Sequence, residues 1–309
     1  MARYLARRLL SMIPVLLGIT LITFLVMQVV PGDPLQLMVD PKGRELDPET
    51  IRAIKAKWGL DLPVHLQYLR FLSNAIRGDL GFSYRFNRDV NITVLERIPA
   101  TATLATAAMV LAMLIGITLG IASAVRHRTW FDVGSMVFAL AGVSTPIFWL
   151  GLMMMYLFGV VWKVLPPSGY GTWRNLIMPA VALGLSSSGV LARLTRSSML
   201  NVIRSEYITT ARAKGLSERT VIYRHALKNA LIPVITILGV QTGSLLSGAV
   251  VTETVFAWPG VGRLLMESIM NRDLPVIQGC VLLIATIFLL MNLVVDINYA
   301  LIDPRIRYR

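Results

Sequence analysis

The chain has 309 residues, of which 55% are hydrophobic, and its formal net charge is +13. Only 15% of the residues are charged, whereas soluble globular domains carry about a quarter, so the composition excludes an ordinary water-soluble domain and indicates a protein of the lipid bilayer. An excess of Lys and Arg over Asp and Glu can also indicate nucleic-acid binding. Here the placement of the basic residues explains the charge, and we predict no nucleic-acid partner.

Six stretches are long and apolar enough to cross roughly 30 Å of hydrocarbon as helices. They cover residues 9–30, 99–125, 131–162, 175–200, 229–253 and 275–302. The third is too long for a straight span, and Pro146 predicts a kinked and tilted helix rather than two spans. The first is longer than the apolar region of a signal peptide and no small-residue cleavage site follows it, so we interpret it as an uncleaved anchor.

Residues 31–98 are polar enough to form a small outer subdomain between the first and second spans. Helix start and stop residues predict two short amphipathic helices within it, at about 47–59 and at about 63–78. Their apolar stripes need a covering surface. Either they pack on the outer ends of the spans or they form a docking surface for an outside partner.

The loops and ends of the chain show a charge asymmetry that predicts its orientation. If six spans start from a cytoplasmic N-terminus, the inner side collects 16 of the 30 Lys and Arg residues and only four acidic residues. The outer side then holds the other 14 basic residues with 12 acidic ones. Because cytoplasmic loops carry the excess of Lys and Arg, we predict that both termini are cytoplasmic.

Small residues recur within two of the predicted spans. Gly116 and Gly120 are four residues apart in the second span, which indicates tight helix packing. In the fifth span, Gly239, Gly243 and Ser247 form a stripe of small residues on one side of the helix. Polar residues lie beside this stripe, which favours the wall of a transmembrane pathway. The candidate pathway-lining residues are Gln241, Ser244, Ser247, Glu253 and Ser187.

Two of these candidates have alternative interpretations. Ser187 lies in a run of three serines, and serines in membrane helices commonly bond their own backbone. Glu253 falls near the outer boundary of the fifth span, where we expect water to reach it. It is either a gate or partner contact, or a plain surface acid.

The loop AWPGVG at 257–262 is predicted to turn tightly between the fifth and sixth spans. Trp258 suits a membrane interface. The loop is either an ordinary interfacial turn or an outer gate over the pathway. The gate candidates are Trp258, Pro259, Gly260 and Val261.

Two other classes of membrane protein are disfavoured. An ion-driven carrier needs ionisable residues deep in its spans, and only Asp296 qualifies, for which ion pairing or backbone capping near the inner end of the last span is the simpler role. An intramembrane enzyme needs a catalytic constellation, but the three histidines fall in separate regions, and the single cysteine, Cys280, suits packing. We predict no catalytic residue, no metal site and no cofactor in this chain.

A strongly basic segment separates the fourth and fifth spans on the predicted inner side. Residues 206–214 predict a helix, Gly215 can take the left-handed conformation that ends it, and Ser217 can cap a second short helix from Glu218. Two helices meeting at a glycine form a compact elbow. Apolar residues at 216 and 221–223 are expected to lie on its surface, which indicates that a partner protein buries them.

The elbow sequence EYITTARAKGLSERTVIYRHALKNALIPV resembles the cytoplasmic coupling loop of permease subunits in ATP-binding cassette importers. In the general pattern of that loop, Glu-Ala-Ala is followed after three residues by Gly and after nine more by Ile-x-Leu-Pro; Ala211, Gly215 and Leu227 match it here. The version present is similar to that of the branch for dipeptides, oligopeptides, glutathione and nickel. VVPGDP at 29–34, FAWPGVGRLLMESIMNRDLPVIQ at 256–278 and the C-terminal NLVVDINYALIDPRIRYR also agree with that branch, so the resemblance covers essentially the whole chain.

The resemblance implies an all-α, six-helix type I importer permease in a bacterial inner membrane. Its division would be 1–30 for the tail and first helix, 31–98 for the outer subdomain and 99–309 for a five-helix core with a coupling loop at 201–228. The implied partners are a second homologous permease, two ATP-binding subunits that hold ATP and Mg²⁺, an extracytoplasmic substrate-binding protein and membrane lipid. The implied coupling residues are Glu206, Ala211, Lys214, Gly215, Leu216, Ser217, Val221 and Tyr223.

The chain has no G-x-x-x-x-G-K-[ST] phosphate loop, so we expect ATP hydrolysis to reside in another polypeptide. The transported substrate is either a peptide, including glutathione, or nickel. The lack of a His or Cys cluster in the predicted spans favours peptides.

Overall fold

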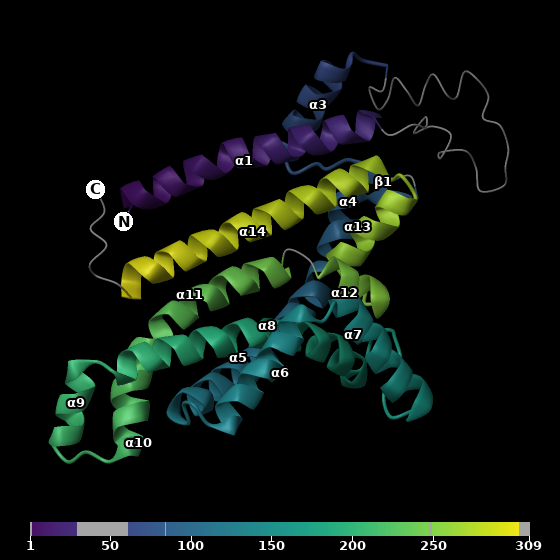
Figure 1. Cartoon of the computed structure of the whole chain (residues 1–309). Helices are drawn as coiled ribbons and strands as arrows, with labels where there is room; N and C mark the ends of the chain where they lie inside the picture. The colour runs from purple at the N-terminus through teal and green to yellow at the C-terminus, as the bar shows by residue number, and fades with distance from the viewer. Residues whose placement is uncertain (1, 30–60, 84, 247–248, 303–309) are drawn as a thin grey trace. The chain divides into compact units, whose positions relative to one another are not determined.

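The computed structural model describes residues 2–29, 61–83, 85–246 and 249–302 (Figure 1). The helix predicted at 47–59, most of VVPGDP, Ser247 and the last seven residues lie outside this part of the chain. The described residues are almost entirely helical, as predicted. They fall into two compact units, Met1–Pro99 with Gly260–Thr286, and Ala100–Pro259 with Ile287–Arg309.

Five helical segments in the described residues are long and apolar enough to cross a membrane. Four of them lie along α1 (Ala2–Val29), α5 (Ile98–Val125), α8 (Trp173–Ile203) and α14 (Leu274–Ile302). The fifth runs through α11 (Leu227–Leu246). A sixth is counted if a bent pair forms one span, which agrees with the predicted six.

The bent pair is the third predicted span, and its break lies at the predicted proline. It consists of α6 (Trp130–Ser144), then α7 (Ile147–Met154) and the π-helix η1 (Met155–Val161). Thr145 is extended and Pro146 has no N–H to continue the helical hydrogen bonds. The two halves meet at 99°, a far sharper bend than the kink that we expected.

The first unit contains the described part of the predicted outer subdomain. Its α3 (Val64–Ile76) begins after Pro63, as predicted, and its Tyr68 ring packs on Phe24 of α1 with centroids 5.5 Å apart. No residue of α3 is buried, and Leu69 and Ile76 of its apolar stripe are 55% and 79% exposed within the described chain. The strands β1 (Phe82–Ser83) and β2 (Arg88–Asp89) then form a short antiparallel hairpin.

The core of the first unit gathers α4 (Val90–Leu95), α13 (Val261–Met270) and the first turns of α14. Val90, Val94 and Leu264 pack there with Cys280, which is buried and has the packing role predicted for it. Asp273, in the turn before α14, accepts a hydrogen bond from Ser83. Burial raises the pKa of this Asp273 carboxyl.

In the second unit, α8 packs against α5, α6 and α11. Glycines set the closest approaches between these helices. A Cβ atom added at Gly116 would lie 2.6 Å from Leu191 Cβ, and one at Gly120 would lie 2.5 Å from Thr195 Cβ. The tight packing predicted for these two glycines is therefore confirmed. A similar contact joins Gly189 of α8 to the backbone of α6 at Ala139.

Gly120→Ala should destabilise the protein by about 1 to 3 kcal/mol, because the added methyl group forces two helix backbones apart. Gly134→Ala is the matched control: Gly134 is also helical, is exposed, and has nothing within 4 Å of an added Cβ. The control should be neutral or slightly stabilising, since Ala favours helix more than Gly. Thermal unfolding of the two purified variants in detergent measures this difference, and equal midpoints would contradict the close-packing argument.

Candidate functional site

A helical elbow joins α8 to α11 (Figure 1). Its first arm is α9 (Glu206–Ala213), and its second arm is α10 (Glu218–Thr220) followed by the π-helix η2 (Val221–Ala226). Gly215 has a φ of +77° and turns the chain after α9. The Ser217 hydroxyl accepts a hydrogen bond from the backbone N–H of Thr220 and so caps α10. The helix–glycine–cap arrangement predicted from the sequence is therefore present.

The facing surfaces of the two arms form a closed apolar core. Ile208 of α9 and Val221 of η2 are completely buried there, and Ala211 and Ile222 are nearly so. The same cluster continues into the ends of the neighbouring membrane helices through Ile121, Ala124, Met199 and Ala230. Continuous packing of this kind fixes the elbow to α5, α8 and α11, so it can move with them as a rigid body.

The outer surface of the elbow carries two exposed apolar side chains and several exposed Arg and Lys side chains. Leu216 is 40% exposed and Tyr223 is 58% exposed. Exposed basic residues along the elbow and at its base include Arg204, Lys214, Arg219, Arg224 and Lys228.

An ion pair bridges the two arms across the Gly215 turn. The Arg212 guanidinium donates to both carboxylate oxygens of Glu218, at 2.6 Å and 3.1 Å. The hydrogen bond to Glu218 raises the pKa of Arg212, which keeps this guanidinium charged. A two-point contact between planar groups fixes their orientation, so the pair restrains the angle between the arms.

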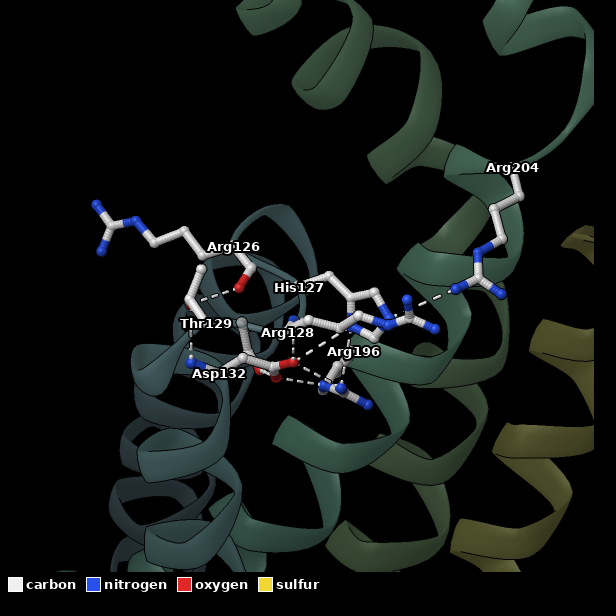
Figure 2. A network of polar contacts seen from close by, with 8 residues as sticks. Arg126, His127, Arg128, Thr129, Asp132, Arg196 and Arg204 are labelled. Atoms are coloured by element: carbon white, nitrogen blue, oxygen red, sulfur yellow. Dashed lines mark hydrogen bonds and ion pairs between the residues drawn. The ribbon is translucent and has the colours of Figure 1, made fainter.

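A second polar cluster lies where α5, α6 and α8 meet, close to the start of the elbow (Figure 2). At its centre is Asp132 in the first turn of α6, which is only 2% exposed. Arg196 of α8 donates to both Asp132 oxygens, from Nε at 2.6 Å and from Nη2 at 2.7 Å. Ser123 of α5 and the backbone N–H of Arg128 also donate to this carboxylate. The buried charge is thus fully compensated, as burial of a carboxylate requires.

His127 connects this cluster to the end of α8. Its Nδ1 lies 3.2 Å from Asp132 Oδ2 and its Nε2 lies 3.5 Å from the Arg204 guanidinium. Nδ1 also lies 3.2 Å from Nη2 of Arg196, so the imidazole contacts both members of the Asp132–Arg196 pair. Since Arg204 immediately precedes the elbow, the loop between α5 and α6 is linked to the point where the elbow begins.

The family of this chain follows from comparison with known proteins. The family described as "Binding-protein-dependent transport system inner membrane component" matches residues 116–308, and the family of the corresponding N-terminal component matches residues 1–105. The chain belongs to this family. It is a multi-pass permease subunit of an ATP-binding cassette importer, as the resemblance of the elbow implied.

The permease is similar over its full length to two curated relatives. It is 44% identical to the dipeptide transport system permease protein DppB of Alkalihalophilus pseudofirmus and 43% identical to the glutathione transport system permease protein GsiC of Salmonella paratyphi A, with all of each chain covered. Among solved structures it resembles a chain of the MetNI methionine transporter in an inward-facing form, at a TM-score of 0.58 and 14% identity, over 68% of the permease and 96% of that chain. This last likeness shows the fold alone.

The structure places the predicted coupling residues together on the elbow, with one correction. Val221 was expected on a partner-binding surface, but it is buried inside the elbow; Ala211, which the resemblance implied as a coupling residue, is buried there too, and both hold the arms together. Ile222, expected on the same surface, is buried too. Among the described apolar residues of the elbow tip, Leu216 and Tyr223 remain available to a partner. Short-range spacing did not reveal which face of η2 would turn inward.

The predicted pathway wall on the fifth span also needs correction. Gly239 and Gly243 do not face an open space: added Cβ atoms would lie 2.2 Å from Val295 and 3.1 Å from Met291, both on α14. Gln241 is half-buried on the same face of α11 as Val234, which packs against α5 and α8. Ser244 is exposed. The glycine stripe of α11 is therefore a helix contact, like that of Gly116 and Gly120.

Glu253 and Ser187 lie in different surroundings. Glu253, on α12 (Val250–Val255), is completely buried and accepts a hydrogen bond from Thr101 of α5 at 2.7 Å. The expectation that water reaches Glu253 is wrong. Ser187 is half-buried, and the neighbouring Ser188 donates to the backbone oxygen of Leu185 in its own helix, which is the ordinary role considered for this serine run.

The outer loop is likewise more buried than an interfacial turn should be. Trp258 is 2% exposed, and its indole N–H donates to the backbone oxygen of Ala100 at 2.8 Å. Its ring also meets Tyr170 edge to face, with centroids 4.8 Å apart. Val261 is 2% exposed in the core of the first unit, Gly260 is buried and Pro259 is half-buried. Trp258 therefore anchors α12 to α5 instead of lying at the membrane interface as expected.

The Asp132 cluster was missed by the sequence reasoning, although two signals for it exist. Thr129 and Asp132 have the spacing of a helix cap, which marks the start of α6. Arg196 lies within an apolar segment, where a charge needs a partner. The two signals mark both residues but do not pair them, because Glu206 is nearer to Arg196 in the sequence than Asp132 is. Asp296, for which a structural role was favoured, is half-buried in α14.

Proposed function

We propose that this permease forms half of the transmembrane pathway of an ATP-driven peptide importer and that residues 206–228 couple it to separate ATPase subunits. Peptide is the proposed substrate class because the full-length relatives are named for dipeptides and glutathione. The single observation that carries the coupling role is the elbow, in which a rigid apolar core supports an exposed apolar tip at Leu216 and Tyr223.

Exposed apolar residues on a charged, water-facing protrusion are best explained by a protein partner that covers them. The partner proposed here is an ATPase subunit whose groove receives the elbow. When two ATPase subunits close around ATP and Mg²⁺, they would rock the elbow, and the elbow core would carry this movement into α5, α8 and α11. ATP and Mg²⁺ would be held by those subunits, and this chain would contribute no cofactor site.

The proposed orientation puts the elbow and both termini in the cytoplasm and the region 61–98 outside. The exposed Arg and Lys side chains of the elbow support this orientation, since cytoplasmic loops are enriched in Lys and Arg. On the outer side, residues 31–98 would form a subdomain near the docking position of an extracytoplasmic binding protein. A second, homologous permease chain would supply the other half of the pathway.

Reconstitution tests this function directly. The permease, its second permease and its ATPases are incorporated in proteoliposomes loaded with ATP and Mg²⁺, and radiolabelled alanylalanine or glutathione is added outside with the binding protein. We expect uptake only with internal ATP and with all four subunits present. Uptake by this permease alone, driven by a proton or sodium gradient without ATP, would show that it is a secondary transporter and would overturn the proposal.

A further inference from the structure

The exposed face of α8 is polar along most of its inner half. Ser186, Arg193, Ser197, Asn201 and Arg204 recur at intervals of three, four or seven residues, so they lie on one side of the helix. Ser186 is half-buried and the other four are exposed. The opposite side is buried against neighbouring helices, and its residues include Gly184, Ser188, Leu191, Thr195 and Ser198.

Other exposed surfaces of the same unit have a different chemistry. On α6, Val133, Val137 and Phe138 are 53%, 60% and 50% exposed, as expected for side chains that face lipid. Polar and charged groups that face hydrocarbon cost several kcal/mol and are therefore rare. The contrast between the two faces indicates that the polar side of α8 faces water rather than lipid.

Arg193 is the unusual member of this stripe. It lies about 15 Å along the helix axis from Ile203 and about 4.5 Å deeper than Arg196. Arg196 is neutralised by Asp132, whereas the Arg193 guanidinium makes no hydrogen bond or ion pair within residues 2–29, 61–83, 85–246 and 249–302. An exposed, uncompensated guanidinium inside a membrane helix offers two parallel N–H donors to a carboxylate.

We propose that Arg193 lines the transmembrane pathway and transiently binds the terminal carboxylate of the peptide as it passes. This inference rests on the proposed peptide substrate, since every unblocked peptide carries such a carboxylate at neutral pH. Ser197 and Asn201, one and two turns closer to the cytoplasm, provide further polar contacts along the exit. Binding to one hydrated guanidinium is weak enough for release, which a transport pathway requires.

Transport kinetics provide the first test. In the reconstituted complex, Arg193→Gln should lower uptake of alanylalanine about tenfold at subsaturating peptide, equivalent to about 1.4 kcal/mol, while ATPase stimulation by the binding protein is retained. Arg193→Lys keeps the charge but loses the two-point contact, so it should recover part of the uptake. Equal uptake by the Gln variant and the wild type would overturn the assignment, as would equal losses in the Gln and Lys variants.

Thiol labelling provides the second test and separates a water-filled pathway from a lipid headgroup contact. In a Cys280→Ala background in nanodiscs, Arg193→Cys should react with an anionic methanethiosulfonate, and transport turnover with alanylalanine should slow that reaction. Val137→Cys, on the exposed apolar face of α6, is the matched control and should not react. An unreactive Arg193→Cys, or reactivity insensitive to peptide, would mean that Arg193 contacts lipid phosphate or a protein surface instead.

Different results would contradict peptide import and the role of Arg193. If the wild-type complex shows no ATP-driven peptide uptake, the proposed function is wrong and the carboxylate assignment is wrong with it. If the wild type imports peptide but the Arg193 variants behave as it does, only the assignment of Arg193 is wrong.

Discussion

Arg196→Gln is expected to destabilise the permease by about 3 kcal/mol, and Asp132→Asn by less. Removing one partner of a buried ion pair leaves an uncompensated charge, which costs about 3 to 5 kcal/mol in a fully buried site. Here the two partners differ, because the Asp132 side chain is 3% exposed and the Arg196 side chain is 25% exposed. A carboxylate without Arg196 stays buried, whereas a guanidinium without Asp132 can reach water.

The double variant Asp132→Asn/Arg196→Gln is the informative control. It carries no uncompensated charge, so it should be more stable than Arg196→Gln alone, and the cycle of four proteins gives the coupling free energy of the pair. Thermal unfolding in detergent, read as loss of monodisperse protein, measures each midpoint. If both single variants lie within about 0.5 kcal/mol of the wild type, the cluster is a surface ion pair of ordinary strength.

Leu216→Asp should nearly abolish assembly with the ATPase subunits and ATP-driven uptake. Placing a carboxylate in an apolar groove costs at least about 3 kcal/mol, which corresponds to more than a hundredfold weaker association. Leu216→Met, which preserves volume and apolar character, should behave as wild type. Because Leu216 is 40% exposed within this chain, neither variant should disturb folding.

Gly215 provides an independent test of the same elbow. Nothing lies within 4 Å of a Cβ added there, so any effect of substitution comes from its φ of +77°. Gly215→Val should strain the turn by about 1 to 2 kcal/mol and weaken coupling, whereas Gly215→Asn should be tolerated, since Asn adopts the left-handed region more readily. Co-purification of the ATPases and vesicle uptake provide the measurements. Wild-type behaviour of both Leu216→Asp and Gly215→Val would reduce the elbow to a solvated loop whose basic residues only fix topology.

The parts of this fold that the sequence predicted well depend on local signals. Apolar runs located the spans, Pro146 located the break in the third, and Gly215 with Ser217 located the turn of the elbow. Each of these signals acts within a few residues of its effect, through hydrogen bonding or backbone geometry. They therefore need no knowledge of what packs against them.

The parts that were wrong or missed depend on contacts between distant residues. Glu253 and Trp258 were expected near water, but Thr101 and Ala100 provide their buried hydrogen-bond partners from more than 150 positions away. Asp132 and Arg196 are 64 residues apart. Periodicity shows that a helix has a polar or a small face, but not which neighbour that face meets. The glycines of α11 were accordingly assigned to a pathway when they meet α14.

The glycine contacts of α8 have a mechanical consequence. Backbone and Cβ atoms of α8 lie against the backbone of α5 at Gly116 and Gly120, and the backbone of α8 at Gly189 lies against the backbone of α6. If α8 slid along its axis by one residue, about 1.5 Å, side chains would clash with the neighbouring helices at the positions where glycine now allows close approach. Steric overlap therefore prevents these three helices from sliding past one another along their axes. We therefore expect a force applied at one end of α8 to rotate α5, α6 and α8 together. The displacement is then largest at the end of this three-helix block that is farthest from the pivot.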